Sequence, residues 1–207
     1  GVTPELLEQY RAAHLSWWHA FWETSGVSIP SEPEVEKFWY ASHYLMACCC
    51  KTGKFAPGIF GNWITTNFPA WLGDYHLNYN YEAPWWGVFS SNKVFLADPY
   101  DQPLLDYIPK ARENARKELG CRGIYSQVGI GPKGLAVRTY LKDGRELPEL
   151  AFWGQKSNAA FGAVNMMMRF YSTWDANYAQ KYAIPAGGGG LLGGLSEIRG
   201  RSVCDLQ

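Results

Sequence analysis

The sequence has little charge and no excess of either sign. Only 18% of the 207 residues are charged, and 19 basic residues balance 19 acidic ones. This balance gives no indication of the basic surface that binds nucleic acid or an anionic membrane, so we expect neither as a partner. No apolar run approaches the roughly 20 residues of a membrane-spanning helix. Residues 1–10 lack the basic flank and apolar stretch of a signal peptide.

Cysteine is scarce, and its spacing does not suit a metal site. Three of the five cysteines are consecutive, Cys48, Cys49 and Cys50, at the end of an apolar helical pattern. No CxxC pair is present, so the spacing of a zinc site is missing. We interpret the run as small buried residues and expect neither a metal nor a cofactor.

Aromatic residues are abundant, at 16%, and ten of them are tryptophan. Four tryptophans, Trp63, Trp71, Trp85 and Trp86, fall in one short segment. Two explanations stay open, because a large helical core uses aromatic residues freely and an indole can also stack on the apolar face of a sugar ring. With 47% hydrophobic residues the chain has enough apolar material for a folded core in either case.

Helical spacing of apolar residues dominates the chain and predicts an all-α fold. Thr3 followed by Pro4 and Glu5 predicts a helix start. The residues at helical spacing after it are Leu6, Leu7, Tyr10, His14, Trp17 and Phe21. A second helix is expected to open at Ser31, with Glu34 completing a capping box. Its predicted buried stripe is Val35, Phe38, Trp39, Ser42, Leu45, Met46 and Cys49.

Further helices are predicted at 75–89, at 98–120 with interruptions at Pro103 and Pro109, at 157–174 and at 175–182. The helix at 157–174 is expected to turn inward Ala160, Phe161, Val164, Met167, Met168 and Tyr171. Residues 53–73 lack periodicity and predict a long aromatic loop, and residues 121–150 predict a β-hairpin between helices. Residues 185–207 are rich in glycine and resemble a flexible or non-native tail, so we divide the chain into 1–184 and 185–207.

Polar residues are densest between residues 69 and 86. Asp74, His76, Asn78, Asn80 and Glu82 alternate there with aromatic or apolar residues. An extended backbone would place all five on one face, and a helix would align only the first, third and fifth. A buried polar group without a partner costs about 1–3 kcal/mol, so these groups need each other, water or a ligand with many hydroxyls. They either cap a helix and fix the loop, or form a sugar-binding surface.

The FWGQKSNAAF segment at 152–161 is a second candidate part of a sugar-binding site. Gln155 and Asn158 lie at the start of a predicted helix, whose N-terminal end could bind hydroxyls. A plain helix start with Ser157 as its cap explains the same residues without a ligand.

Residues 56–80, APGIFGNWITTNFPAWLGDYHLNYN, resemble the start of the catalytic barrel in six-hairpin glycosidases. They are most similar to the inverting α-L-fucosidases of glycoside hydrolase family 95. The shared features are the small and cysteine residues at 47–50, the Pro-Gly pair at 57–58, the Asn-Trp pair at 62–63 and the Asn-x-Asn motif at 78–80. The resemblance covers roughly residues 15–92. It implies a partial (α/α)6 toroid of antiparallel helical hairpins and a secreted or periplasmic location.

The resemblance also implies roles for residues. Asn78 and Asn80 would position and polarise the attacking water, together with a carboxylate from later in the family's chain. The general acid of the family also lies more than a hundred residues beyond the Asn pair. The substrate-binding candidates are Trp63, Trp71, His76, Trp85, Trp86, Gln155 and Asn158.

The paired carboxyls of the polar segment, Asp74 and Glu82, are further catalytic-site candidates. Inverting hydrolysis needs two carboxyl groups about 6.5–9.5 Å apart. On a helix Asp74 and Glu82 would be about 12 Å apart along the axis, and further apart on an extended backbone. We therefore keep both at the site without assigning them as the acid and base.

These observations predict a glycoside hydrolase, or its truncated catalytic domain, with a carbohydrate substrate. A polysaccharide lyase could use His76 or Tyr79 to abstract a proton, but residues 57–92 contain no Arg or Lys to bind a uronate. A sugar-binding fragment without catalysis is the third alternative. Because half a barrel would expose broad apolar surface, we also expect self-association into a homo-oligomer.

Overall fold

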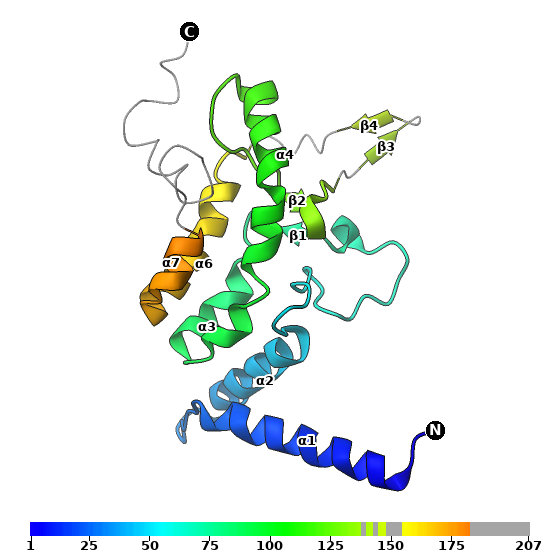
Figure 1. The fold of residues 1–207 in the computed structure, drawn as a ribbon, viewed down its shortest axis with the longest axis vertical. Coiled ribbons are helices and arrows are strands. Elements are labelled where there is room, and N and C mark those ends of the chain that lie inside the picture. The colour runs from blue at the N-terminus through cyan, green and yellow to red at the C-terminus, as the bar shows by residue number, and fades with distance from the viewer. Residues whose placement is uncertain (138–139, 143–144, 148–154, 183–207) are drawn as a thin grey trace.

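The chain is mainly helical in a computed structural model that describes residues 1–137, 140–142, 145–147 and 155–182 (Figure 1). The division expected at residue 184 lies outside the described residues. Two antiparallel sheets of two strands each accompany the helices in the described part of the chain. No helix in these ranges is long and apolar enough to cross a membrane.

An antiparallel pair of helices, α1 (Pro4–Glu23) and α2 (Pro33–Cys49), forms one end of the molecule (Figure 1). Aromatic rings connect them: Trp18 stacks on Tyr44 with ring centroids 4.9 Å apart, and Trp22 meets Tyr40 at 5.4 Å. As predicted, the Thr3 hydroxyl caps α1 and accepts a hydrogen bond from the following turn. The cap of α2 is one residue later than predicted, and no side chain bonds to its first turn.

The predicted buried faces of both helices are largely wrong. On α1 only Phe21 is buried, and Tyr10 is 63% exposed. On α2, Phe38 is 69% exposed, while the buried residues are His43, Ala47 and Cys49. The reason is that the hairpin contacts the rest of the described chain mainly through the C-terminal ends of its helices, which leaves Tyr10, Phe38 and other apolar residues nearer the N-terminal ends exposed.

Ser91, Asn92 and Lys93, which we name the junction, connect this hairpin to the body of the molecule. Ser91 Oγ lies 2.8 Å from His43 Nε2, and Asn92 donates to the Thr24 carbonyl at 3.2 Å. Lys93 is fully buried, and its ammonium donates to the Thr24 hydroxyl at 2.6 Å. Burial lowers the pKa of Lys93. Three consecutive residues therefore supply much of the polar attachment of the hairpin.

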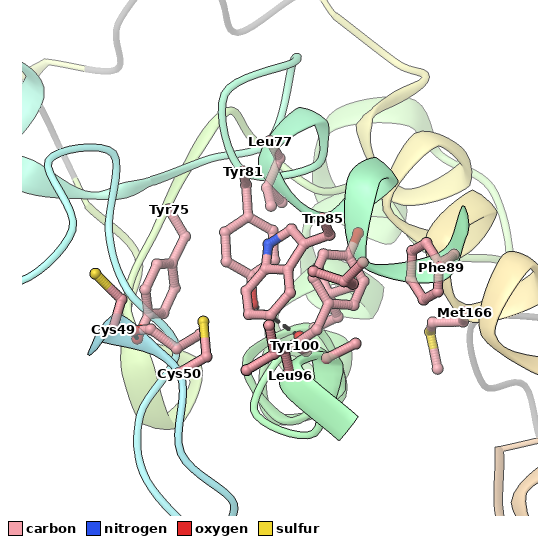
Figure 2. Close-up of a cluster of buried hydrophobic side chains, with 14 of the residues drawn as sticks. Cys49, Cys50, Tyr75, Leu77, Tyr81, Trp85, Phe89, Leu96, Tyr100 and Met166 are labelled. Atoms are coloured by element: carbon pink, nitrogen blue, oxygen red, sulfur yellow. Dashed lines mark hydrogen bonds between the residues drawn. The ribbon is translucent and has the colours of Figure 1, made fainter. Parts of the chain in front are cut away.

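The body packs around an aromatic core between α3 (Trp86–Ser90), α4 (Asp101–Leu119) and α6 (Asn158–Thr173) (Figure 2). Tyr81 stacks on Tyr100 at 4.9 Å, and Trp85 meets the same ring edge-on at 5.3 Å. The Tyr100 hydroxyl donates to the Gly162 carbonyl of α6 at 2.8 Å. The core therefore joins residues from the middle of the chain to α6.

The helix predicted at 98–120 is present as α4, without the expected interruptions. Pro103 falls in its first turn, where a missing N–H leaves no hydrogen bond broken. Pro109 lies inside the helix, which continues past it. Gly120 ends α4 in the left-handed conformation, with φ 63°.

α6 and the short α7 (Ala176–Tyr182) also confirm predicted helices. The predicted inward face of α6 is wrong, since Val164 and Tyr171 are exposed. Its buried residues are Asn158, Ala159, Gly162, Ala163, Asn165 and Met166. A Cβ at Gly162 would lie 3.2 Å from the Leu104 side chain. The close approach of α6 to α4 requires small side chains on the buried face of α6. A search for large apolar residues at helical spacing does not detect such a face.

The helix predicted at 75–89 is wrong. A strand, β1 (Tyr75–His76), pairs antiparallel with β2 (Gly129–Ile130), and a 3-10 turn at Ala83–Trp85 leads into α3. Residues 77–82 form turns despite their polar–apolar alternation, and only the end of the predicted range is α-helical, as α3. The predicted β-hairpin is confirmed by β3 (Tyr140–Lys142) and β4 (Arg145–Leu147). Residues 53–73 form the predicted loop, which ends in a tight turn at Ala70–Gly73.

Candidate functional site

The polar segment begins in the short strand β1, which is hydrogen-bonded on both sides. Leu77 N–H donates to the Val128 carbonyl at 2.9 Å, next to the β1–β2 pairing, and Ile59 N–H donates to the Asp74 carbonyl at 3.1 Å. The side chains of Asp74 and His76 lie together, with Nδ1 3.1 Å from the carboxyl Oδ1, and both are buried. Burial raises the pKa of Asp74, while the hydrogen bond and charge of His76 lower it. The strand thus holds a buried Asp–His pair at the base of the site.

Gly129 on β2 makes room for this pair. A Cβ at Gly129 would lie 2.5 Å from Asp74 Oδ2, closer than a real Cβ contact allows. The Gly129 carbonyl also accepts from the Gln127 side chain at 2.6 Å. The buried carboxylate therefore depends on a glycine more than fifty residues away in the sequence.

A strained turn places an exposed indole beside the buried pair. Trp71 and Leu72 both have positive φ, 49° and 57°, and Gly73 follows at 67°. A left-handed conformation costs a residue with a side chain about 1–2 kcal/mol. The turn sets the Trp71 ring 5.9 Å from the His76 ring, with half of Trp71 exposed. Such strain concentrates at binding sites.

The loop before this turn docks closely on it. A Cβ at Gly58 would lie 2.3 Å from the Gly73 carbonyl oxygen, which is backbone and cannot rotate away. We expect Gly58→Ala to lower the free energy of unfolding by about 1–3 kcal/mol, the usual cost of overpacking. Gly87→Ala is the matched control, since nothing lies within 4 Å of its Cβ position. Urea unfolding measures both, and equal stability of the two variants would contradict the close packing.

The Asn-x-Asn motif follows β1 in a surface turn. Tyr81 N–H donates to the His76 carbonyl at 3.0 Å and closes the turn. Asn78 is half-buried and Asn80 is exposed, and neither side-chain amide makes a hydrogen bond within the described residues. Tyr79 is exposed between them. The turn therefore leaves the hydrogen-bonding groups of two amides available on a fixed backbone.

A second exposed indole lies against this turn. The rings of Tyr79 and Trp86 meet edge-on with centroids 5.7 Å apart, and both side chains are partly exposed. Two amides and two aromatic rings thus occupy one short surface stretch. Amide hydrogen bonds to hydroxyls, together with flat apolar rings, are the combination that binds a sugar.

Glu82 occupies a different environment from Asp74. Its side chain is fully buried (0% exposed), and neither carboxyl oxygen has a hydrogen-bond partner among the described residues. Burial raises the pKa of Glu82 to about 8. Asn165 of α6 donates to the Glu82 carbonyl at 2.9 Å. Asp74 therefore lies against β2 and Glu82 against α6, and neither carboxyl is at the surface.

The other candidates from the sequence lie elsewhere. Trp85 is in the aromatic core and is 1% exposed (Figure 2). Trp63 is exposed in the long loop. Asn158 is buried and donates to the carbonyls of Ser126 and Gln155 at 3.2 and 3.3 Å, so its amide anchors the start of α6. Gln155 is half-buried beside it.

Sequence reasoning missed Gly129 and Asn165, which contact Asp74 and Glu82 from distant parts of the chain. Gly129 opens the glycine-rich stretch GIGPKG, which was a signal of close backbone approach. Nothing in the nearby sequence indicates that Asn165 contacts Glu82, because the residues around it have the pattern of an ordinary apolar helix.

Comparison of the sequence with known proteins identifies its family. The glycosyl hydrolase family 95 catalytic domain matches residues 25–186. This chain belongs to that family. The family 95 chain is also similar to the probable alpha-fucosidase A of Aspergillus niger (strain ATCC MYA-4892 / CBS 513.88 / FGSC A1513), with 30% identity over 93 residues. The match covers 44% of the family 95 chain and 12% of that fucosidase, so the chain spans a small part of that relative. No solved structure matches.

Family membership confirms the resemblance seen in residues 56–80 and the mainly helical fold. The family's catalytic domain is an (α/α)6 barrel. The matched residues include α2 to α7 and the whole polar segment, whereas α1 precedes them.

Proposed function

We propose that this chain binds a carbohydrate at the 78–80 turn and belongs to a glycoside hydrolase that cleaves glycosidic bonds. The observation that carries the proposal is a pair of amides, Asn78 and Asn80, that make no side-chain hydrogen bond within the described residues and lie on a turn that follows β1. An asparagine amide both donates and accepts, as does a sugar hydroxyl. Family 95 membership supports the hydrolytic chemistry.

In this proposal Asn78 and Asn80 position the attacking water or a substrate hydroxyl. Inverting hydrolysis also needs a protonated carboxyl at the leaving oxygen and an ionised one at the water. Asp74 and Glu82 are buried against other elements. We therefore propose that both carboxyls of the reaction come from outside the 74–82 segment, and that Asp74 acts by holding His76 in place.

An α-linked L-fucoside is the first substrate to test, because the similar fungal protein is named a probable alpha-fucosidase. The apolar face of the sugar would rest on Trp86 or Trp71, whose indoles are partly exposed on either side of the motif in sequence. Trp63 stays a more distant candidate.

The test is calorimetric titration of the chain with L-fucose and with an α-L-fucosyl oligosaccharide. Asn78→Ala and Asn80→Ala should each weaken binding by about tenfold, the loss expected for one or two hydrogen bonds. Asn177→Ala, which removes an exposed amide on α7, is the control and should bind as the wild type does. Unchanged affinity in both motif variants would remove the proposed site.

Sugar binding without hydrolysis is the second candidate, favoured by the burial of Asp74 and Glu82. Incubation with an aryl α-L-fucoside separates the two. Turnover that is lost in Asn78→Ala supports the hydrolase, and saturable binding with no turnover supports the binding fragment. A lyase is less favoured, because its candidate base His76 is buried and bonded to Asp74.

A further inference from the structure

Asn165 of α6 is a fully buried amide of which only one half is hydrogen-bonded. Its Nδ2 donates to the Glu82 carbonyl at 2.9 Å, whereas its Oδ1 has no partner among the described residues. A buried acceptor without a partner destabilises a fold, and asparagine is also a poorer helix former than leucine. A leucine of similar size would avoid both penalties. The stability of α6 therefore does not explain the amide, and its one bond indicates a role at Glu82.

This bond reaches the Asn-x-Asn motif through a single peptide group. The peptide between Glu82 and Ala83 is planar, so its carbonyl and its N–H cannot turn independently. Asn165 holds the carbonyl, and the Ala83 N–H donates to the Tyr79 carbonyl at 2.9 Å. The Tyr79 carbonyl belongs to the peptide that precedes Asn80, between the two motif amides. Two hydrogen bonds and one rigid peptide thus connect α6 to the centre of the motif.

Two further contacts hold the same turn. Trp85 N–H also donates to the Glu82 carbonyl, at 3.2 Å, and the Tyr81 hydroxyl donates to the Tyr100 carbonyl at 2.7 Å. These contacts join parts of the chain that are closer in the sequence, whereas Asn165 lies 83 residues beyond Glu82. Asn165 therefore adds a restraint from a separate helix.

We propose that Asn165 is a positioning residue: it fixes the turn that presents the amides of Asn78 and Asn80 to a sugar. This inference rests on the proposed sugar binding at the turn. The residues that carry it lie inside the 25–186 range that matches the family 95 domain. Groups that are fixed before the ligand arrives bind it more tightly, because less conformational entropy is lost on association.

Asn165→Leu tests the proposal, since leucine keeps the approximate volume of the side chain and removes the donor. Amide hydrogen exchange followed by NMR should show Ala83 N–H exchanging about threefold to tenfold faster, the effect of one lost hydrogen bond. Leu77 N–H, which donates to the Val128 carbonyl, should exchange at the wild-type rate. The urea midpoint should shift by less than about 0.5 M, because the unpaired Oδ1 is removed together with the bond.

Sugar binding is the second measurement. Calorimetric titration with L-fucose and an α-L-fucosyl oligosaccharide should show about threefold to tenfold weaker affinity in Asn165→Leu. Asn114→Ala is the matched control, because Asn114 is a buried amide on α4 that donates to the Tyr107 hydroxyl at 3.2 Å and the Tyr125 carbonyl at 3.3 Å. It should lower the urea midpoint without changing the exchange of Ala83 or the affinity for either sugar.

The outcomes distinguish the positioning role from the proposed function. Wild-type exchange of Ala83 in Asn165→Leu, or faster exchange with unchanged affinity, would overturn the positioning role, as would equal effects in Asn114→Ala. Faster exchange in a chain whose wild type binds neither sugar would overturn the proposed function, while showing that Asn165 holds the turn. If leucine prevents folding, Asn165→Ala, which cannot overpack the interior, gives the same two readouts.

Discussion

At about pH 9, the Glu82→Gln variant should be more stable than the wild type by on the order of 4 kcal/mol. The glutamate carboxyl is fully buried and has no hydrogen-bond partner among the described residues, and its pKa is raised from 4.5 to about 8. An ionised carboxylate at this position is strongly disfavoured. The amide of glutamine has nearly the same shape and stays neutral at every pH.

The direction follows from proton binding. Between pH 4.5 and about 8 the unfolded chain loses the Glu82 proton while the folded chain keeps it. The stability that Glu82 contributes is therefore complete below pH 4.5, falls as pH rises to about 8, and stays low above it. At about pH 5 the wild type and the variant should have similar stability.

Urea unfolding at about pH 5 and about pH 9, followed by tryptophan fluorescence, measures the difference. Glu118→Gln, which changes an exposed glutamate on α4, is the control and should keep the pH dependence of the wild type. If Glu82→Gln loses stability with pH as steeply as the wild type does, the buried carboxyl of Glu82 is not the cause.

The adjacent tryptophans Trp85 and Trp86 should respond in opposite ways to truncation. Trp85 is 1% exposed and contacts Tyr81 and Tyr100, so Trp85→Ala removes the centre of the aromatic core. We expect a loss of about 3–5 kcal/mol in the free energy of unfolding. That is a large part of the 5–15 kcal/mol by which a domain is typically stable.

Trp86 is partly exposed beside the Asn-x-Asn turn, so Trp86→Ala should change stability by less than about 1 kcal/mol. It should instead weaken sugar binding about tenfold, through loss of a stacking surface. Thermal unfolding and calorimetric titration of both variants measure the two effects. A Trp86→Ala variant that binds sugar normally would leave Trp71 as the remaining platform.

The positions of most helices could be predicted from the sequence because their signals are local. Thr3 and Pro4 start α1, and Gly120 ends α4 through a conformation that glycine adopts readily. The buried faces could not be predicted in the same way. Which side of α2 or α6 is covered depends on what packs against it, and for α6 the answer was a face of small and amide side chains.

The candidate site was predicted in part. The motif at 78–80 was singled out from the sequence because it resembles the Asn-x-Asn motif of the family, and its role at a sugar-binding site stays a prediction. The surroundings of Glu82 and Asp74 were not found, because they depend on Asn165 and Gly129, which lie on elements brought together only by the fold. Composition likewise could not predict that Trp85 is buried and Trp86 is partly exposed, since one of two neighbouring residues can face the core while the other faces the solvent.

The junction at 91–93 has a mechanical consequence. α1 is 20 residues long, so its length is about 30 Å, and it is held mainly near its C-terminal end. A small rotation of α1 about the buried ammonium of Lys93 would therefore move its N-terminal end much further than its C-terminal end. A rotation of about 5° at the pivot moves the free end by roughly 3 Å. The distance between the free end of α1 and the 78–80 turn would therefore vary with each such rotation.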